Sequence, residues 1–340
     1  MIAAAGPVNN NAVQFTANGF LVSGDLITAR FPSIKTAIII NDFVACGYGV
    51  LSLDHKTEAV HLSGPKHDEE GNRGLPIACV GAGTGLGECY LTSSNRDPNT
   101  YECFASEGGH SEFAPRNDEQ VLMLNYLKSK FNGRNRISIE RVVSGTGLSN
   151  IYDFMTSQYP EKIDKAVHSK IINAGSMMGK LISDNSSTYE LANKTMRLFA
   201  SAYGSEVGVA ALKWIPCGGL YITGGLTPKN MSWIQKNGTN NNDNLFMEAY
   251  RDKGRVSGLL EGIPLYAVLE EGLGLRGSWV LAVKRMREDL KVDSDVTNSI
   301  SNHNVAAASQ EVSGWAKLVN VGIGVAILAG MVQLSKRKDW

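Results

Sequence analysis

Three short runs between residues 79 and 147 combine residue types that could hold a phosphate and a polyol. The first is the glycine-rich run Gly81–Gly87, the second is Ser106–His110, and the third is Glu140–Gly145. Glycines let backbone N–H groups approach phosphate oxygens, and carboxylates with an imidazole supply strong acceptors and a donor for sugar hydroxyls. The order and spacing of these runs predict a site that binds a hydroxylated small molecule and phosphorylates it.

Asp42 is the best candidate for a catalytic group. It follows the apolar run Ile34–Ile40, which is typical of a buried parallel strand whose carboxyl end carries a functional residue. A carboxylate within hydrogen-bond reach of a sugar hydroxyl can accept its proton as phosphoryl transfer proceeds. The dipeptide Asn41-Asp42 alone is more typical of a helix N-cap, and the two roles are compatible.

The glycine-rich run is predicted to be a strand–turn–strand rather than the strand–loop–helix of a P-loop. Both flanks, Leu75–Gly81 and Glu88–Thr92, have the pattern of short strands. A tight hairpin that binds nothing is the alternative. The residues predicted to approach phosphate are Gly83, Thr84, Gly85 and Gly87.

Glu107, His110 and Glu140 are the candidate sugar ligands, because carboxylates and imidazoles can bind adjacent hydroxyls. One alternative is that Glu140 is a surface residue at a helix start. Another is that Glu107 and His110 are half of a zinc site, but the chain has no cysteine cluster, so no metal ligands are predicted.

Further elements of an α/β protein surround these runs. Helical patterns cover residues 118–130, with an apolar face of Val121, Leu122, Leu124, Tyr126 and Leu127, and residues 151–159 and 189–212, the last with a capped start at Ser186–Thr188. Strands are expected at 220–223 and 264–269, and the glycine pairs Gly218-Gly219 and Gly224-Gly225 flank the first of these. Simple turn glycines are the alternative for both pairs.

The composition limits the partners. The 340 residues include 33 Lys plus Arg and 33 Asp plus Glu, so the formal net charge is zero and nucleic acid is not expected as a partner. Five scattered cysteines without a CxxC run indicate reduced, intracellular thiols.

The C-terminal part has a different character. Residues 291–316 are polar and are expected to form a linker. Residues 317–335 contain the uncharged run Leu318–Leu334, with small residues at every fourth position, and are expected to form a transmembrane helix. A core or amphipathic helix is the alternative. A short anchor with a basic end suggests a kinase facing the cytosol from an organelle membrane, such as the mitochondrial outer membrane.

Taken in order, these motifs resemble the bacterial-type glucokinase family, from about Ala5 to about Lys284. The segments that carry the resemblance are Ala5–Val8, Ile40–Phe43, Gly81–Gly87, Ser106–His110, Glu140–Leu148, Gly218–Gly225, Asp252–Arg255 and Gly274–Gly277. The resemblance implies a ribonuclease-H-like actin-ATPase fold, with D-glucose and ATP as substrates and Mg²⁺ as cofactor. It further implies that Asp42 is the general base, that Asn41 joins the hexose ligands, and that Gly218, Gly219, Gly224 and Gly225 lie on the adenosine side.

Two departures qualify what the resemblance implies. The family's opening D-x-G-G-T phosphate motif occurs nowhere in the chain, and the family's Thr-Asn-x-x-Trp becomes Thr16–Phe20. We therefore expect an incomplete small domain at 1–52 plus 273–290 and a large domain at 53–272. The competing hypothesis is a catalytically impaired, membrane-tethered hexose-binding remnant. A sugar-sensing repressor is disfavoured, because no helix-turn-helix or basic patch is present, and a homodimer is left open.

Overall fold

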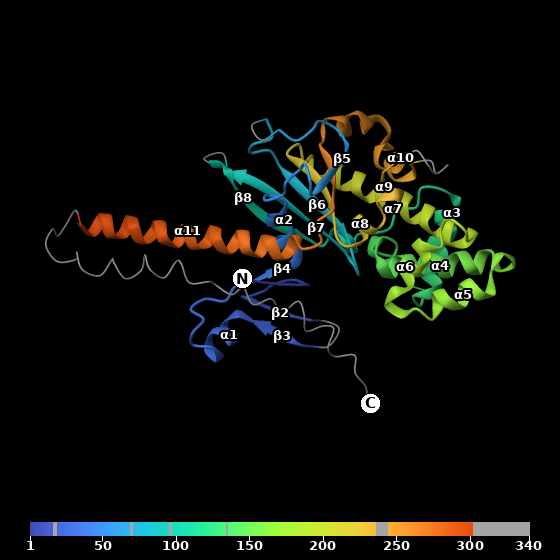
Figure 1. The fold of residues 1–340 in the computed structure, drawn as a ribbon, viewed down its shortest axis with the longest axis horizontal. Helices are drawn as coiled ribbons and strands as arrows, with labels where there is room; N and C mark the ends of the chain where they lie inside the picture. The colour runs from blue at the N-terminus through green and yellow to red at the C-terminus, as the bar shows by residue number, and fades with distance from the viewer. Residues whose placement is uncertain (16–18, 69–70, 95–96, 134, 236–243, 302–340) are drawn as a thin grey trace. The chain divides into compact units, whose positions relative to one another are not determined.

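The computed structural model describes residues 1–301 except 16–18, 69–70, 95–96, 134 and 236–243 (Figure 1). The chain divides into two compact units. Among the described residues, unit 1 is Met1–Ser52 together with Leu273–Ser301, and unit 2 is Leu53–Gly272.

Unit 1 is built on short paired strands and three helices, two of which pack closely against each other. Strand β1 (Ile2–Ala4) pairs in parallel with β4 (Ile39–Asn41), and β2 (Ala12–Gln14) pairs antiparallel with β3 (Leu21–Ser23). The helices are α1 (Gly24–Arg30), α2 (Asp42–Val50) and α11 (Leu273–Ser301).

Glycines allow α2 and α11 to cross in close contact. A Cβ added to Gly277 would lie 1.7 Å from the Ala45 carbonyl oxygen, and one added to Gly49 would lie 2.4 Å from the Leu273 carbonyl oxygen. A side chain at either position would force the helices apart. This crossing fixes α2, and with it the Asn41-Asp42 dipeptide at its start.

A six-stranded sheet forms the centre of unit 2, in the order β5-β10-β9-β6-β7-β8. The central strands β10, β9 and β6 are parallel, whereas β5, β7 and β8 are antiparallel to their neighbours. Every residue of β6, β9 and β10 is buried, as expected for parallel strands covered on both faces. The strand bounds are β5 Ala59–Ser63, β6 Ile77–Ala82, β7 Leu86–Ser94, β8 Asp97–Ser106, β9 Gly219–Thr223 and β10 Leu265–Val268.

Helix α7 (Glu190–Trp214) is the long buried helix of unit 2. The Ala82 N–H at the end of β6 donates a hydrogen bond to the Tyr203 hydroxyl of α7. Helix α7 therefore packs against one face of the sheet. The other α-helices are α3 Asp118–Lys130, α4 Gly145–Gln158, α5 Lys165–Ile172, α6 Met178–Asp184, α8 Leu226–Lys229, α9 Met231–Ile234 and α10 Leu245–Arg251. The 3₁₀ turns are η1 Gly108–His110, η2 Ile139–Arg141, η3 Pro160–Lys162, η4 Gly175–Met177 and η5 Gly254–Gly262.

Two local predictions from the sequence are wrong, and a third is confirmed only in part. Helix α3 has the predicted bounds, but Val121 and Leu122 are exposed, while Gln120, Met123 and Leu127 are buried. Helix α7 begins after Tyr189 without a side-chain cap, because the Ser186 hydroxyl instead donates to the Ser183 carbonyl at the end of α6. The apolar run at 34–40 forms a strand only from Ile39, where β1 pairs with it.

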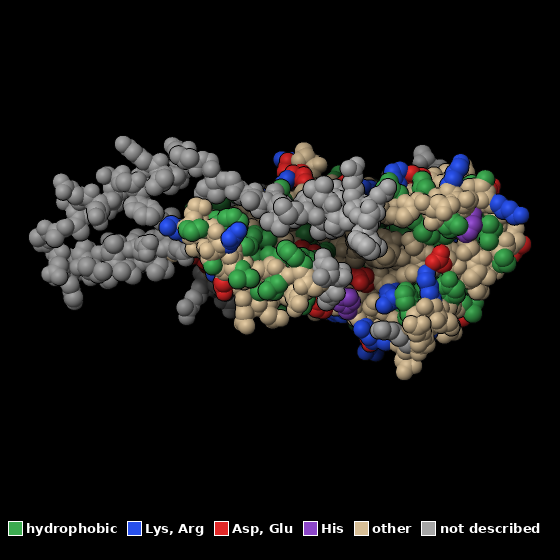
Figure 2. Space-filling model, turned by 90° about the horizontal axis from the view of Figure 1, so that it is seen from below, with side chains coloured by type: hydrophobic (Ala, Val, Ile, Leu, Met, Phe, Trp, Pro, Cys, Tyr) green, Lys and Arg blue, Asp and Glu red, His purple; other side chains and the backbone are tan. Residues whose placement is uncertain are grey.

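The segment expected to be a linker from residue 291 begins as helix, because α11 continues to Ser301. The expected membrane anchor at 317–335 lies outside the described residues. Among the helices of the described ranges, none is both long and apolar enough to cross a bilayer. On the face shown in Figure 2, described basic and acidic side chains are interspersed, in keeping with the zero net charge.

Candidate active site

The glycine-rich run forms a tight hairpin between β6 and β7, as the strand–turn–strand prediction requires. Ala82 pairs with Leu86, and the Gly83 N–H donates to the Gly85 carbonyl at 2.8 Å. Gly83 faces open space, since a Cβ there would meet nothing within 4 Å. The backbone at Gly83 is therefore free of side-chain obstruction, and the hairpin is compatible with a phosphate loop, which stays a prediction.

The start of α4 holds this hairpin from one side. The Gly145 N–H donates to the Gly83 carbonyl at 2.8 Å, and the Thr146 hydroxyl donates to the Thr84 carbonyl at 3.2 Å. Ser144 caps the helix by accepting from the Gly147 N–H at 2.9 Å. A hairpin beside a helix N-terminus is a favourable place for an anion, because the helix dipole favours negative charge there.

Ser144 and Thr146 contact or cap the helix start beside the hairpin, and the sequence prediction did not single them out. Both were part of the Glu140–Leu148 block, but neither was given a role. The signal was a serine immediately before a glycine-rich helix start, which is a typical N-cap. Their hydroxyls lie 3.0 Å apart, and Ser144 also donates to the Glu140 carbonyl at 2.6 Å.

Glu140 holds the hairpin from the other side. Its Oε2 accepts a hydrogen bond from the Leu86 N–H at 3.0 Å. A Cβ on Gly85 would lie 2.5 Å from the same oxygen, so a side chain there would displace the Glu140 carboxylate. The predicted sugar ligand Glu140 is thus bonded directly to the predicted phosphate loop.

The Glu107–His110 turn follows β8 and packs against the start of β7, the strand that leaves the hairpin. A Cβ on Gly109 would lie 2.0 Å from the Leu86 carbonyl oxygen, so the turn rests against the start of β7. The side chains of Glu107 and His110 approach to 3.7 Å, and both are more than half exposed. They therefore face solvent together, and either could bind a ligand without leaving a buried group unpaired.

Hydrogen bonds between residues 111–113 and 137–139 bring Glu140 beside this turn. The Ile139 N–H donates to the Ser111 carbonyl, and the Phe113 N–H donates to the Ile137 carbonyl, each at 2.8 Å. Arg136 also donates to the His110 carbonyl. Because of these bonds, η2 is fixed beside η1, and Glu107, His110 and Glu140 belong to one region of unit 2.

Asn41 and Asp42 belong to unit 1. Asn41 is the N-cap of α2, with its Oδ1 accepting from the Phe43 N–H at 2.9 Å and from the Val44 N–H at 3.2 Å. Its amide nitrogen donates to the Gly6 carbonyl at 3.1 Å. Asn41 therefore provides the cap that the sequence pattern predicted, and Asp42 is the first residue of the helix.

The two glycine pairs around β9 lie at opposite ends of the strand. Gly224, with φ +83°, packs against Ala82 at the end of β6 beside the glycine hairpin. Gly218 instead packs against Leu75 and Pro76, before β6 begins. The five-residue strand separates the pairs by roughly 15 Å. Gly224-Gly225 are thus placed beside the hairpin, whereas Gly218-Gly219 fit the turn-glycine alternative.

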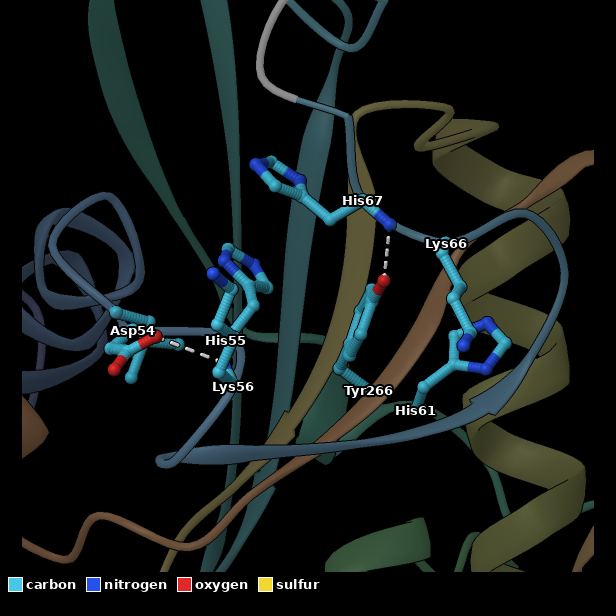
Figure 3. A pocket seen from close by; sticks show the side chains of 8 residues that line it. Asp54, His55, Lys56, His61, Lys66, His67 and Tyr266 are labelled. Atoms are coloured by element: carbon cyan, nitrogen blue, oxygen red, sulfur yellow. Dashed lines mark hydrogen bonds between the residues drawn. The ribbon is translucent and has the colours of Figure 1, made fainter.

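A separate hollow of about 580 Å³ lies at the β5–β10 side of unit 2 (Figure 3). None of the predicted site residues lines it. Its imidazoles contact protein groups: His55 Nε2 lies 2.8 Å from the Tyr221 hydroxyl, and the rings of His55 and His67 stack with centroids 3.9 Å apart. The hollow is therefore distinct from the residues described above.

Mg²⁺ is the cofactor that the resemblance implies, and such an ion would arrive with the nucleotide phosphates. Such an ion is held mostly by phosphates and water, with one or two carboxylates. Within the described ranges, no group of three or more His, Cys, Asp or Glu side chains could hold a metal ion by itself. Glu140, the carboxylate bonded to the hairpin, already uses Oε2 for the Leu86 N–H.

The fold and these residues define a sugar kinase of the actin-like ATPase fold. The solved glucokinase of an Antarctic psychrotroph matches with a TM-score of 0.62 and 27% identity, over 82% of this chain and 78% of that one. The Balamuthia mandrillaris glucokinase, solved in complex with glucose, matches with a TM-score of 0.66 over 82% and 76% of the two chains. At 20% identity, the second likeness shows the fold alone.

The chain belongs to the glucokinase family. The family model described as Glucokinase matches residues 1–285. The glucokinase of Synechocystis sp. is 38% identical over 295 residues, covering 83% of this chain and 78% of the relative. The glucokinase of Hahella chejuensis is 31% identical over 278 residues, covering 82% and 77%. These relatives support an enzyme, and none of them supports the hypothesis of a membrane-tethered remnant.

Proposed function

We propose that this chain transfers the γ-phosphoryl group of ATP to the 6-hydroxyl of D-glucose, giving glucose 6-phosphate and ADP. The observation that carries the proposal is the hydrogen bond from the Leu86 N–H to Glu140 Oε2. It joins a group suited to binding sugar to a hairpin suited to binding phosphate. A kinase needs its two substrates in fixed register, because phosphoryl transfer depends mainly on positioning and charge stabilisation.

Asp42 is proposed as the general base. As the O6–phosphorus bond forms, the bond from phosphorus to the β-phosphate oxygen breaks, ADP leaves, and the Asp42 carboxylate takes the O6 proton. The position of Asp42 in the first turn of α2 suits a carboxylate, since the helix N-terminus interacts favourably with negative charge.

Glu107, His110 and Glu140 are proposed to bind the hexose hydroxyls. The exposed pair Glu107–His110 offers an acceptor and an imidazole, while Glu140 keeps Oε1 for the sugar. Asn41 is proposed to contribute through its one amide hydrogen not used by Gly6, with positioning of Asp42 as its main role.

The nucleotide is proposed to lie along the hairpin, the start of α4 and Gly224-Gly225. The backbone of Gly83, Thr84 and Gly85 would approach the phosphates, and Mg²⁺ bound to those phosphates would neutralise part of their charge. Gly87, paired with Gly81 in the β6–β7 ladder, supports the hairpin from within the sheet. Gly218-Gly219 are left out of this site because of their place at the far end of β9.

The direct test is product formation by the purified full chain. With ATP, Mg²⁺ and glucose, ³¹P NMR should show glucose 6-phosphate and ADP in equal amounts, and omitting either substrate should abolish both. Fructose, mannose and galactose in place of glucose measure the hexose preference. ADP formation that does not depend on any hexose would contradict the proposal, since it would indicate an ATPase.

A further inference from the structure

A fully buried carboxyl group lies directly beneath the predicted hexose turn. Glu88 is on β7, two residues after Leu86, and its partner across the strand pair is Ser106 of β8. Its side chain is completely inaccessible to solvent. A Cβ on Gly108 would lie 1.7 Å from Glu88 Oε2, so this carboxyl is in contact with the backbone of the turn.

The group that faces Glu88 is a second buried carboxyl, that of Glu206 on α7. Within the described residues, no donor makes a hydrogen bond to either Glu88 oxygen or to Glu206 Oε1. An ionised carboxylate can only accept hydrogen bonds, so two facing carboxylates repel each other. One proton between them converts the repulsion into a hydrogen bond.

Few charges are available to compensate a second ionisation. Lys213 Nζ lies 3.9 Å from Glu206 Oε1, too far for a hydrogen bond. The charge of Lys253, which follows α10, lowers the pKa of Glu206. The charges of Arg116 and Asp252 in turn influence the pKa of Lys253. On the turn, Glu107 and His110 point into solvent. The charged groups around the pair are thus Lys213, Lys253, Arg116, Asp252, Glu107 and His110.

The titration of these groups agrees with a shared proton. Burial and, to a smaller extent, the charge of Glu206 raise the pKa of Glu88, while Lys213 opposes them, and the result is a pKa of about 8. Burial also raises the pKa of Glu206. Lys253 is a second group that changes charge in the same range, because burial lowers its pKa to about 8.

We propose that Glu88 is a positioning residue for the hexose turn. One proton shared with Glu206 keeps the two carboxyl groups hydrogen-bonded to each other beneath Gly108. Loss of that proton displaces the Glu107–His110 turn and weakens hexose binding. The turn responds because Gly108 and Gly109 have no side chains and rest directly on Glu88 and Leu86. This inference rests on the proposed function, since it takes Glu107 and His110 as hexose ligands.

The test measures glucose binding by calorimetry between pH 7 and 9.5 for the full chain and for Glu88→Gln. If the doubly ionised pair does not bind glucose, Kd should rise about fourfold by pH 8.5 and about 30-fold by pH 9.5 relative to pH 7. The amide of the variant can donate to Glu206 and has no proton to lose in this range, so its Kd should stay constant. A flat wild-type profile, or the same rise in the variant, would overturn the inference.

Matched variants separate this effect from its alternatives. Glu206→Gln also leaves one carboxyl beside one amide, so it should likewise remove the rise and gives the answer if Glu88→Gln does not fold. Lys253→Met removes the other group with a pKa of about 8 and should keep the wild-type rise. If Lys253→Met removes the rise instead, the inference is wrong.

Nucleotide binding and unfolding temperature, measured at each pH, complete the test. The Kd of ATP should not follow the pH dependence of the glucose Kd, and the protein should remain folded at pH 9.5. A parallel loss of binding of both ligands would mean general unfolding and would contradict a role specific to the turn. Glucose binding that is independent of pH overturns this inference alone. Absence of glucose binding at every pH overturns the proposed function and this inference with it.

Discussion

Replacing Glu140 by alanine should weaken the binding of both substrates. The change removes the carboxylate oxygen that accepts from the Leu86 N–H at 3.0 Å, and it removes the contact that holds Gly85 in place. A hydrogen bond to a charged group contributes about 1.5–3 kcal/mol. Losing it should raise the Kd of ATP by about 10- to 150-fold, because the hairpin is no longer fixed.

Glu140→Gln separates the two roles of this side chain. The amide oxygen can still accept from the Leu86 N–H, so we expect the Kd of ATP to change by less than about threefold, well under 1 kcal/mol. The charge that strengthens hydrogen bonds to sugar hydroxyls is lost, so glucose binding should weaken by about tenfold. Calorimetry with each ligand alone measures both values.

Glu107→Gln is the control, because no hydrogen bond or ion pair joins Glu107 to the hairpin in the described residues, so this change should affect glucose only. Unfolding temperatures of all three variants should lie close to that of the wild type. If Glu140→Ala binds ATP as tightly as the wild type does, the bond to Leu86 does not organise the hairpin, and the coupling argument is refuted.

Three further predictions concern separate parts of the chain. His110→Ala should weaken glucose binding far more than ATP binding by calorimetry, and equal losses would indicate a folding defect. Folding raises the pKa of Glu88 from 4.5 to about 8, so its contribution to stability is full below pH 4.5 and is lost as pH rises to 8. Urea unfolding at pH 5, 6.5 and 8 should show this loss of unfolding free energy in the wild type relative to Glu88→Gln. The same pH dependence of the unfolding free energy in both proteins would contradict it. A reporter fused to residues 291–340 should pellet with membranes and resist carbonate extraction, and a soluble reporter would rule out the predicted anchor.

The sequence predicted those parts of the site that depend on local patterns. The glycine hairpin, the cap before α2 and the bounds of α3 all follow from turn, capping and helix signals within a few residues. The apolar strand Leu220–Thr223 with Gly224 after it also has the expected form. These signals need no knowledge of what packs against the element.

The remaining features depend on tertiary contacts that no local pattern contains. The start of α7 lacks its expected cap because Ser186 bonds to the preceding helix instead. Gly218 and Gly224 flank one strand in the sequence, but only the structure shows that Gly224 packs on Ala82 beside the hairpin while Gly218 packs on Leu75 and Pro76. Val121 and Leu122 fit an apolar face, but the neighbouring helices cover a different side of α3.

The Glu88–Glu206 pair shows the same limit most clearly. The two residues are 118 positions apart and meet only because α7 packs on the sheet. The available signal was a glutamate inside an otherwise apolar strand, which is unusual for a buried position. That signal identifies Glu88 as a residue of interest, but it does not identify the partner.

The central claim is that Asp42 accepts the proton of a hexose bound by Glu107, His110 and Glu140. The most direct measurement compares kcat for glucose 6-phosphate formation with glucose Kd in the wild type and in Asp42→Ala. We predict that kcat falls by about 100-fold or more, the usual scale for loss of a general base, while glucose Kd stays within about threefold. Wild-type turnover in Asp42→Ala, or loss of glucose binding equal to the loss of turnover, would contradict the account.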